Sequence, residues 1–254
     1  MNTDEIRKVM MAMRIRDAWQ TKCMDYVSRA GALFEAVAKV KYKGDKHTEL
    51  RQLVAIQSIG VRLINTTGSA DELLTRGYYQ PAITMIRDLM ECSFLLDLFS
   101  RRPEQLQAWM DLGLKAGDKV FSPYAVRMQL EELDGPRADV RRNQYKFYCG
   151  YGAHVNAAGV TYVAIGNAIQ IGPFPDQQRL IGLTHDLTLL SVMASMHMCV
   201  WLANSQFDIV EGPEFDQLSN AMIVTRSDFF SVAEHLKEIR GAAERDRITK
   251  DMEE

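Results

Sequence analysis

The sequence has 254 residues, of which 47% are hydrophobic and 25% are charged, and its formal net charge is −3. This composition excludes an intrinsically disordered chain, because it holds enough apolar residues to bury a large core. The small negative charge gives the whole chain no electrostatic attraction to nucleic acid or to an anionic membrane, so such binding would need a local basic patch.

The N-terminal segment and the cysteines predict a cytoplasmic protein. The chain starts with polar and acidic residues and continues as an amphipathic segment, which is unlike a secretory signal peptide. Its four cysteines are far apart and none belongs to a Cys-x-x-Cys pair, so we expect reduced thiols. We expect no metal site and no cofactor.

Long amphipathic helices are predicted for the first third of the chain. Thr3 or Asn2 can cap a helix that extends with little interruption to about Val40, and the polar run 41–46 forms a turn before the next helix. We expect that next helix to end at 66–68, because the Ser-x-x-Glu spacing at 69–72 is that of a capping box, which starts a new helix.

Residues 80–99 predict a central helix with a charged pair. Pro81 can open this helix, and apolar residues surround its axis. Arg87 and Glu91 lie one turn apart on the same stripe, so we expect them to be partly or wholly removed from water. Since a buried charge needs a partner, the pair is either a structural ion pair or part of a polar ligand-binding or catalytic pocket.

The rest of the chain predicts shorter helices, one hairpin and a long apolar helix. Helices are expected over about 103–109, 119–133, 136–155 and 176–206, and from about residue 213 onward. Two short β-prone runs, 161–165 and 168–171, flank Gly166 and Asn167 and predict a tight hairpin. Leu187–Phe207 has no Asp, Glu, Lys or Arg, but polar residues interrupt it and aspartates flank it, so we expect a buried helix and not a membrane span.

These elements predict an all-α fold, a helical bundle with one short β-hairpin insertion near residues 161–171. We expect a single helical domain over residues 1–254, because no linker rich in Pro, Gly or Ser divides the chain. Residues 1–46 would form an N-terminal helical hairpin or extension, 47–206 the core bundle, and 207–254 the C-terminal helices.

A cluster of basic and aromatic residues marks a candidate binding surface. Arg141, Arg142, Tyr145 and Tyr148 are spaced so that cations and rings share part of one helical surface, which suits a phosphate backbone or a stacked base. The alternative is an ordinary solvated face on which arginine stems cover tyrosine rings. His154, near the end of the same helix, is the best single candidate for proton transfer.

Two short motifs support enzymatic alternatives. Arg179 and His185 have the spacing used by metal-independent helical ribonucleases, in which an arginine and a histidine act on the scissile phosphate. His185 and Asp186 form the dipeptide of helical metal phosphohydrolases. Further ligands for such a metal would come from His154, Asp208, Asp216 and Asp228. Both patterns also arise by chance in a chain of this composition.

Four segments occur in a defined order along the chain. They are RGYYQPAITMIRDLMECSFLLDLF, PEQLQAW, YKFYCGYGAHVN and IQIGPFPD. Over about Leu50–Ala203 the chain thereby resembles a large family of uncharacterised bacterial all-helical proteins, which is distantly HEPN-like. The resemblance implies that Arg87, Glu91 and His154 form a site. Because many HEPN domains cleave RNA or pair with nucleotidyltransferases in defence and toxin systems, it also implies RNA or protein partners.

We therefore expect a HEPN-like domain that binds a protein or RNA partner, with a homodimer as one form of partnership and with no membrane. The candidate catalytic residues are His154, Arg87 and Glu91. The candidate ligand-binding residues are Arg141, Arg142, Tyr145 and Tyr148. A metal-independent ribonuclease of a defence or toxin system is the alternative, and a metal-dependent phosphohydrolase is the second alternative, so the sequence leaves open whether the chain is an enzyme.

Overall fold

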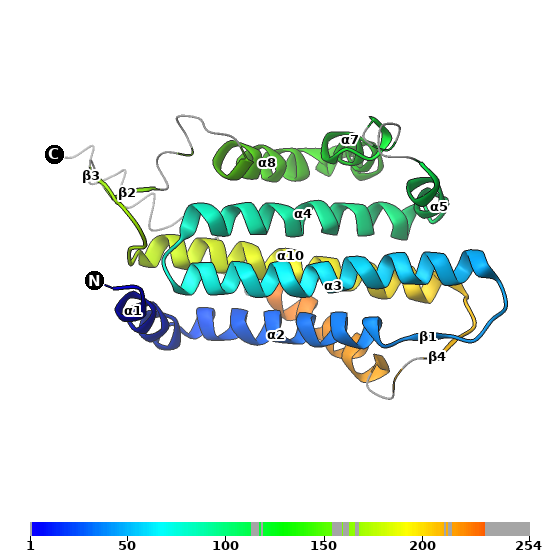
Figure 1. Cartoon of the computed structure of the whole chain (residues 1–254), viewed down its shortest axis with the longest axis horizontal. Coiled ribbons are helices and arrows are strands. Elements are labelled where there is room, and N and C mark those ends of the chain that lie inside the picture. Colours follow the sequence, from blue (N-terminus) through cyan, green and yellow to red (C-terminus); the bar gives the residue numbers. More distant parts are fainter. Residues whose placement is uncertain are drawn as a thin grey trace.

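The computed structural model of the chain consists almost entirely of helices (Figure 1). It describes residues 2–112, 117, 119–153, 159, 163–165, 168–210, 212 and 215–231. The α-helices are α1 (Thr3–Arg16), α2 (Ala18–Ala38), α3 (His47–Thr75), α4 (Tyr79–Arg101), α5 (Glu104–Asp111), α7 (Pro123–Asp134), α8 (Ala138–Tyr148) and α10 (Gln177–Ser205). Residues 215–231 form a further helix, η1 (Gly135–Arg137) is a 3₁₀ turn and η2 (Cys149–Ala153) is a π-helical turn. The prediction of an all-α fold is confirmed.

Four long helices form the centre of the bundle. α2, α3, α4 and α10 lie side by side, and α10 contacts the other three (Figure 1). α7 and α8 form an outer layer against α4, and α1 contacts α2 and α3. Because α2 buries Leu33, Phe34 and Val37 as one of the central helices, the core begins before residue 47, earlier than the sequence predicts.

The long apolar segment forms the central helix α10. By length and composition α10 could cross a membrane. In the structure 61% of its most apolar stretch is buried inside the molecule, and α10 packs against the three other central helices. The prediction that this segment is a buried helix is confirmed, since its apolar residues meet protein on several sides.

Two short β-ribbons connect the helices. β2 (Ala164–Ile165) pairs antiparallel with β3 (Ala168–Ile169), which confirms the predicted hairpin, although Gly166 and Asn167 themselves lie outside the described residues. β1 (Lys41–Tyr42) pairs antiparallel with β4 (Ile209–Val210). The sequence does not reveal this second ribbon, because its two strands come from the turn after α2 and from the segment after α10.

The first predicted helix is interrupted once, at Asp17, which separates α1 from α2, and the helical segment ends at Ala38, close to the predicted Val40. The Asp17 carboxylate accepts hydrogen bonds from the backbone N–H groups of Trp19 and Gln20 and thereby caps α2. Aspartate satisfies the unpaired N–H groups at a helix start, and this local competition ends α1 despite its continuous apolar stripe.

α3 continues through 66–72, where the sequence predicts a boundary, so that prediction is wrong. The Thr66 hydroxyl donates a hydrogen bond to Asp88 of α4 at 2.9 Å, which gives this residue a role inside the helix pair. The chain turns instead at Gly77, whose φ is +79°. A Cβ atom there would lie 2.5 Å from the carbonyl oxygen of Phe174, so only glycine fits this turn.

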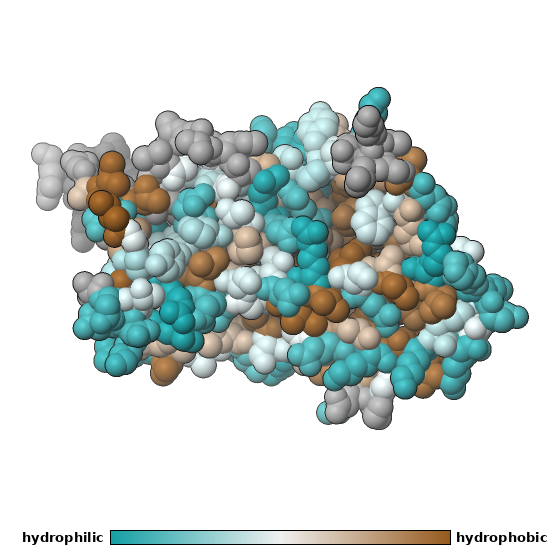
Figure 2. Space-filling view, in the orientation of Figure 1, coloured by the Kyte–Doolittle hydropathy of each residue, from teal (hydrophilic) through white to brown (hydrophobic). Residues whose placement is uncertain are grey.

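The surface over α3 mixes hydrophilic and hydrophobic side chains, and hydrophobic ones gather in the central and right-hand part of the view (Figure 2). Leu50, Val54 and Val61 of α3 are 42%, 50% and 46% exposed. The neighbouring Arg62 forms an ion pair with Asp88 of α4. Apolar residues of this kind are ordinary on protein surfaces, so the α3 surface alone indicates no partner.

Candidate functional site

The predicted ion pair of Arg87 and Glu91 forms on α4. The two side chains approach to 2.7 Å and each is about a quarter exposed, which confirms the expected partial burial. Burial raises the pKa of Glu91, although the Arg87 charge opposes the rise. The Arg87 Nε atom is buried and forms no hydrogen bond within the described part of the chain. Each charge of the pair is thus balanced mainly by the other, which fits the structural interpretation.

The π-helical turn after α8 packs against the same helix. The Thr84 hydroxyl of α4 donates a hydrogen bond to the Gly152 carbonyl at 3.0 Å. A Cβ atom on Gly152 would lie 2.7 Å from Cγ2 of Ile83, so glycine permits this close approach. His154, the third member of the predicted catalytic group, lies outside the described residues. The structure therefore places two of the three candidates.

Arg141 is an internal residue, so its expected place on an exposed basic surface is wrong. Its guanidinium donates hydrogen bonds to Asp97 of α4 and Asp134 of α7, each at 2.7 Å, and its side chain is only 13% exposed. It also lies 4.6 Å from the ring centroid of Phe94. The expectation fails because the fold brings the carboxylates of Asp97 and Asp134 to Arg141, and neither residue belongs to the basic and aromatic pattern of α8.

The other three predicted ligand-binding residues also make internal contacts. Arg142 donates a hydrogen bond to Glu131 at 2.9 Å and remains 40% exposed. The Tyr145 ring lies 5.1 Å from the guanidinium of Arg127, and burial raises the pKa of Tyr145 to about 12. Tyr148 is buried. The arginines and tyrosines of α8 therefore do not combine into one exposed binding surface.

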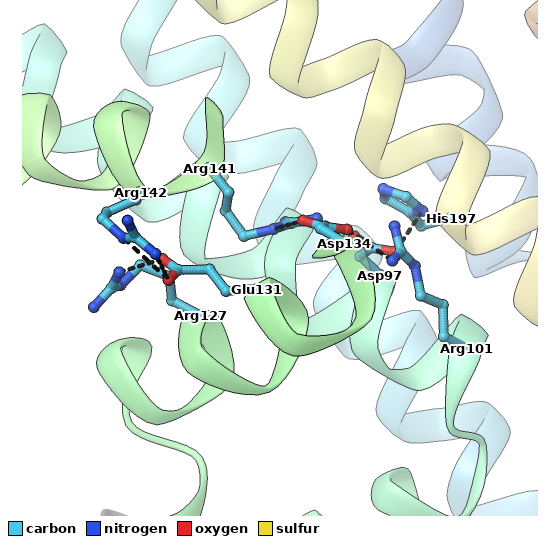
Figure 3. A network of polar contacts seen from close by, with 8 residues as sticks. All are labelled: Asp97, Arg101, Arg127, Glu131, Asp134, Arg141, Arg142 and His197. Atoms are coloured by element: carbon cyan, nitrogen blue, oxygen red, sulfur yellow. Dashed lines mark hydrogen bonds and ion pairs between the residues drawn. The ribbon is translucent and has the colours of Figure 1, made fainter. Parts of the chain in front are cut away.

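Asp97 is the centre of a buried ion network (Figure 3). It is 2% exposed and lies in an apolar run of α4. Arg101 of the same helix and Arg141 of α8 approach its two carboxylate oxygens at 2.7 Å each, and His197 of α10 lies 3.6 Å away. Both arginines also pair with Asp134 of α7. One carboxylate thereby connects the bundle to its outer layer.

His197 is a neutral member of this network. Burial lowers its pKa to about 4, although Asp97 opposes the shift; the charges of Arg141, Arg101 and Arg226 add to it. The imidazole is therefore uncharged at neutral pH, and its contact with the carboxylate is not an ion pair. Neither Asp97 nor His197 was predicted from the sequence as a site residue. Each is a polar residue within an apolar helical run, which is the same pattern that identified the Arg87 and Glu91 pair on α4.

A hollow of about 300 Å³ opens between α8 and the first turns of α10. It combines an aromatic ring, an amide, a guanidinium, an imidazole and a carboxylate, which belong to Phe147, Gln178, Arg179, His185 and Asp186. The two residues with ribonuclease-like spacing therefore line one space. That space lies near a helix N-terminus, where unpaired N–H groups and the helix dipole favour anions.

Internal contacts position the polar groups of this hollow. Arg179 pairs with Asp176, the N-cap of α10, at 2.6 Å and lies 5.4 Å from the ring of Phe174. Asp186 accepts a hydrogen bond from the buried Tyr148 hydroxyl at 2.7 Å. Tyr148 is thus a supporting residue behind the hollow, and the charged groups of the hollow are oriented by their neighbours.

Two aromatic rings fix the orientation of His185. Its imidazole stacks on Phe229 of the helix 215–231, with the ring centroids 5.2 Å apart. Trp19 of α2 lies 5.8 Å from the imidazole on a tilted plane. Three separate segments therefore meet at this histidine, and its ring is held at the edge of the hollow.

Of the ligands expected for a metal phosphohydrolase, those that the structure describes do not form a metal site. Among the residues that the structure describes, no group of three or more His, Cys, Asp or Glu is arranged to hold a metal ion. Asp208 follows the C-terminal end of α10, whereas His185 lies in its N-terminal third. Asp228 is instead engaged by Tyr26 and Lys22 of α2. This geometry removes the support that the dipeptide gave to a metal-dependent reaction.

Comparison of the chain with protein-family models, with curated proteins and with solved structures finds no match. The candidate site is therefore defined by its geometry. It is the hollow between α8 and α10, and the ion network around Asp97 holds α8 in place as one of its walls.

Replacing Asp97 by Asn should lower the free energy of unfolding by about 3–5 kcal/mol, because it leaves Arg141, whose side chain is 13% exposed, and the partly exposed Arg101 to share the Asp134 carboxylate. Urea denaturation followed by circular dichroism measures this loss. Glu72→Gln is the control, since Glu72 pairs with Arg7 on the surface, where both side chains are more than 40% exposed. The control should cost less than about 1 kcal/mol. Equal losses in the two variants would contradict a central role for Asp97.

The depressed pKa of His197 predicts that stability falls with acidity. The unfolded state takes up a proton near pH 6.5 and the folded state only near pH 4, so this contribution is complete above about pH 6.5 and is lost as the pH falls toward 4. The total loss is about 3 kcal/mol. In His197→Gln this part of the pH dependence should vanish, whereas His47→Gln, at an exposed histidine, should retain it. Thermal melts between pH 4 and 7 decide the matter.

Proposed function

We propose that this protein is a HEPN-like helical domain that binds RNA, and that a nucleotide of the RNA enters the hollow between α8 and α10. The observation that carries the proposal is the lining of this hollow, where a guanidinium, an aromatic ring and hydrogen-bonding groups surround one space. RNA offers the complementary groups, which are a phosphate, a stacking base and polar base edges.

Arg179 is the residue that meets the phosphate. It is the third residue of α10, so its charge adds to the positive end of the helix dipole. Its pairing with Asp176 reduces the local positive charge, and about a fifth of its side chain stays exposed to the hollow and to solvent. A single phosphate contact of this kind agrees with the net charge of −3 and should give only a modest RNA affinity.

Phe147 offers the ring on which a base stacks. Its orientation is set by a T-shaped contact with Tyr148, whose ring centroid lies 5.2 Å away. Gln178 and Asp186 add donor and acceptor groups for a base edge. A hollow of about 300 Å³ with an aromatic ring and several polar groups in its wall can enclose a nucleotide, whereas a protein partner needs a contact surface of about 800 Å² on each side, which favours RNA over a protein partner.

Replacing Arg179 by Gln should weaken RNA binding by roughly fivefold to tenfold and reduce the slope of affinity against salt by about one, because one phosphate contact is lost. The measurement is fluorescence anisotropy of a labelled single-stranded RNA of mixed sequence with the full chain. Arg142→Gln is the matched control, since Arg142 is a partly exposed arginine outside the hollow.

The control variant should bind like the wild type. Binding that is lost in Arg142→Gln but kept in Arg179→Gln would move the site to the outer face of α8. Absence of RNA binding by the wild type at low salt would refute the proposal.

A metal-independent ribonuclease is the second candidate, favoured by the position of His185 in the same hollow as Arg179. In that reaction the 2′-hydroxyl oxygen forms a bond to the adjacent phosphorus, while the bond from phosphorus to the 5′ oxygen of the next nucleotide breaks. His185 would accept the 2′-hydroxyl proton, Arg179 would stabilise the negative charge on the phosphate, and water would protonate the departing oxygen.

This second candidate predicts RNA cleavage in the presence of EDTA. His185→Gln should abolish the cleavage and leave RNA affinity within about twofold, because the imidazole moves a proton and the guanidinium carries the binding. His47→Gln controls for a general effect of losing a histidine, and circular dichroism checks that His185→Gln still folds. Cleavage that persists in His185→Gln, or an inactive wild type, would eliminate the ribonuclease and leave the binding proposal standing.

A further inference from the structure

Arg14 of α1 is completely buried. Its side chain is 0% exposed, Nη2 donates a hydrogen bond to the Thr184 hydroxyl of α10 at 3.1 Å, and Nη1 lies 2.7 Å from Asp71 of α3. Within the described residues, neither Nε nor Nη1 forms a hydrogen bond. A buried guanidinium with unused donors is costly, so packing alone does not explain it.

A second hollow, of about 270 Å³, lies between α2, α3 and α10 next to this arginine. Its wall includes both partners of the guanidinium, Asp71 and Thr184. Thr67, also in the wall, is 5% exposed and its hydroxyl forms no hydrogen bond within the described residues. The remaining wall consists of Met24, Val27, Ser28, Gly68 and Leu187. The Thr67 hydroxyl thus faces a space whose remaining wall is mainly apolar, and Arg14 lies directly behind two residues of that wall, Asp71 and Thr184.

We propose that this second hollow binds a small organic carboxylate with a short apolar chain. The Thr67 hydroxyl can donate to a carboxylate in the hollow, and the Arg14 guanidinium can donate to the same carboxylate once Asp71 has moved aside. An amine would be repelled by the guanidinium and would leave these donors unused. The apolar chain would lie against Met24, Val27 and Leu187. This proposal does not rest on RNA binding, because the two hollows have no lining residue in common.

The ligand carboxylate displaces Asp71 from Arg14. Its side chain is 38% exposed, whereas its partner Arg14 is wholly enclosed, so Asp71 can turn toward water and the ligand carboxylate can take its place. The guanidinium then remains paired with one carboxylate throughout the exchange, and no uncompensated charge is left buried. The bound state gains hydrogen bonds that the free state lacks.

Isothermal titration calorimetry of the full chain with hexanoate tests the proposal. Hexylamine and 1-hexanol are matched probes, because they have the same chain length with a cationic or a neutral head. We expect saturable binding of hexanoate that is at least about tenfold tighter than the binding of either matched probe.

Four variants locate the site. Gly68→Leu adds a side chain where a Cβ atom meets nothing within 4 Å, so it should fill the hollow and weaken hexanoate binding at least about tenfold. Thr67→Val removes one donor and should weaken binding about threefold. Asp71→Asn removes the competing carboxylate and should strengthen binding about tenfold. Ala32→Leu, in a different hollow, is the control and should bind like the wild type.

The outcomes separate the parts of the proposal. If hexanoate binds no better than hexanol or hexylamine, the claim that the site recognises a carboxylate is overturned. Unchanged affinity for hexanoate in both Gly68→Leu and Thr67→Val would overturn the claim that it binds in this hollow. Equal weakening in Ala32→Leu and Gly68→Leu would do the same. If Asp71→Asn is unfolded without ligand, refolding on addition of hexanoate supports the exchange of carboxylates, and failure to refold contradicts it.

Discussion

The burial of Asp97 is the constraint on which the arrangement of the outer layer depends. A carboxylate that is 2% exposed is tolerated only when cations reach it, and here one cation comes from its own helix and one from α8. The same two arginines hold Asp134 of α7, and their hydrogen bonds keep the pKa of Asp134 below its ordinary value although burial opposes this. α7 and α8 are therefore attached to α4 by charge as well as by apolar contact. The RNA site that we propose has α8 as one wall, so its shape rests on this network.

α10 contributes residues to the core of the bundle, to both hollows and to the Asp97 network. It contacts the three other central helices, and its successive residues face different surroundings because each position turns by 100°. Thr184 belongs to the wall of the hollow beside Arg14, His185 and Asp186 to the hollow between α8 and α10, and His197 to the Asp97 network. This division explains why the helix shows little amphipathic character and why its polar residues are not a sign of solvent. Several of its polar groups meet a specific partner, as when the Thr184 hydroxyl accepts a hydrogen bond from Arg14.

Arg141, Arg142 and Arg179 show that the most basic part of a sequence need not form the candidate site. Arg141 and Arg142 form the most basic and aromatic part of the sequence, yet both are engaged by carboxylates of α4 and α7. Arg179 attracts less notice in the sequence, but it lies at a helix start beside a hollow. Whether an arginine lines a hollow or lies within an ion network is decided by its neighbours in space, and not by the density of basic residues along the chain. The lining of the hollow therefore directs attention to α10.

Most helices and the close pair on α4 followed from the sequence alone, whereas the Asp17 cap did not and the capping box expected at 69–72 lies inside α3. Asp176 before α10 and the couple of Arg87 and Glu91 depend on groups three or four residues apart, so their hydrogen bonds and ion pair can be anticipated without knowing the fold. Burial could not be anticipated in the same way. Arg141 meets a carboxylate 44 positions away, and Arg14 meets a hydroxyl 170 positions away. Those contacts exist only after the helices have packed, because desolvation and charge pairing are decided by distance in space; the tertiary structure therefore determined which charges are enclosed and which hollows remain.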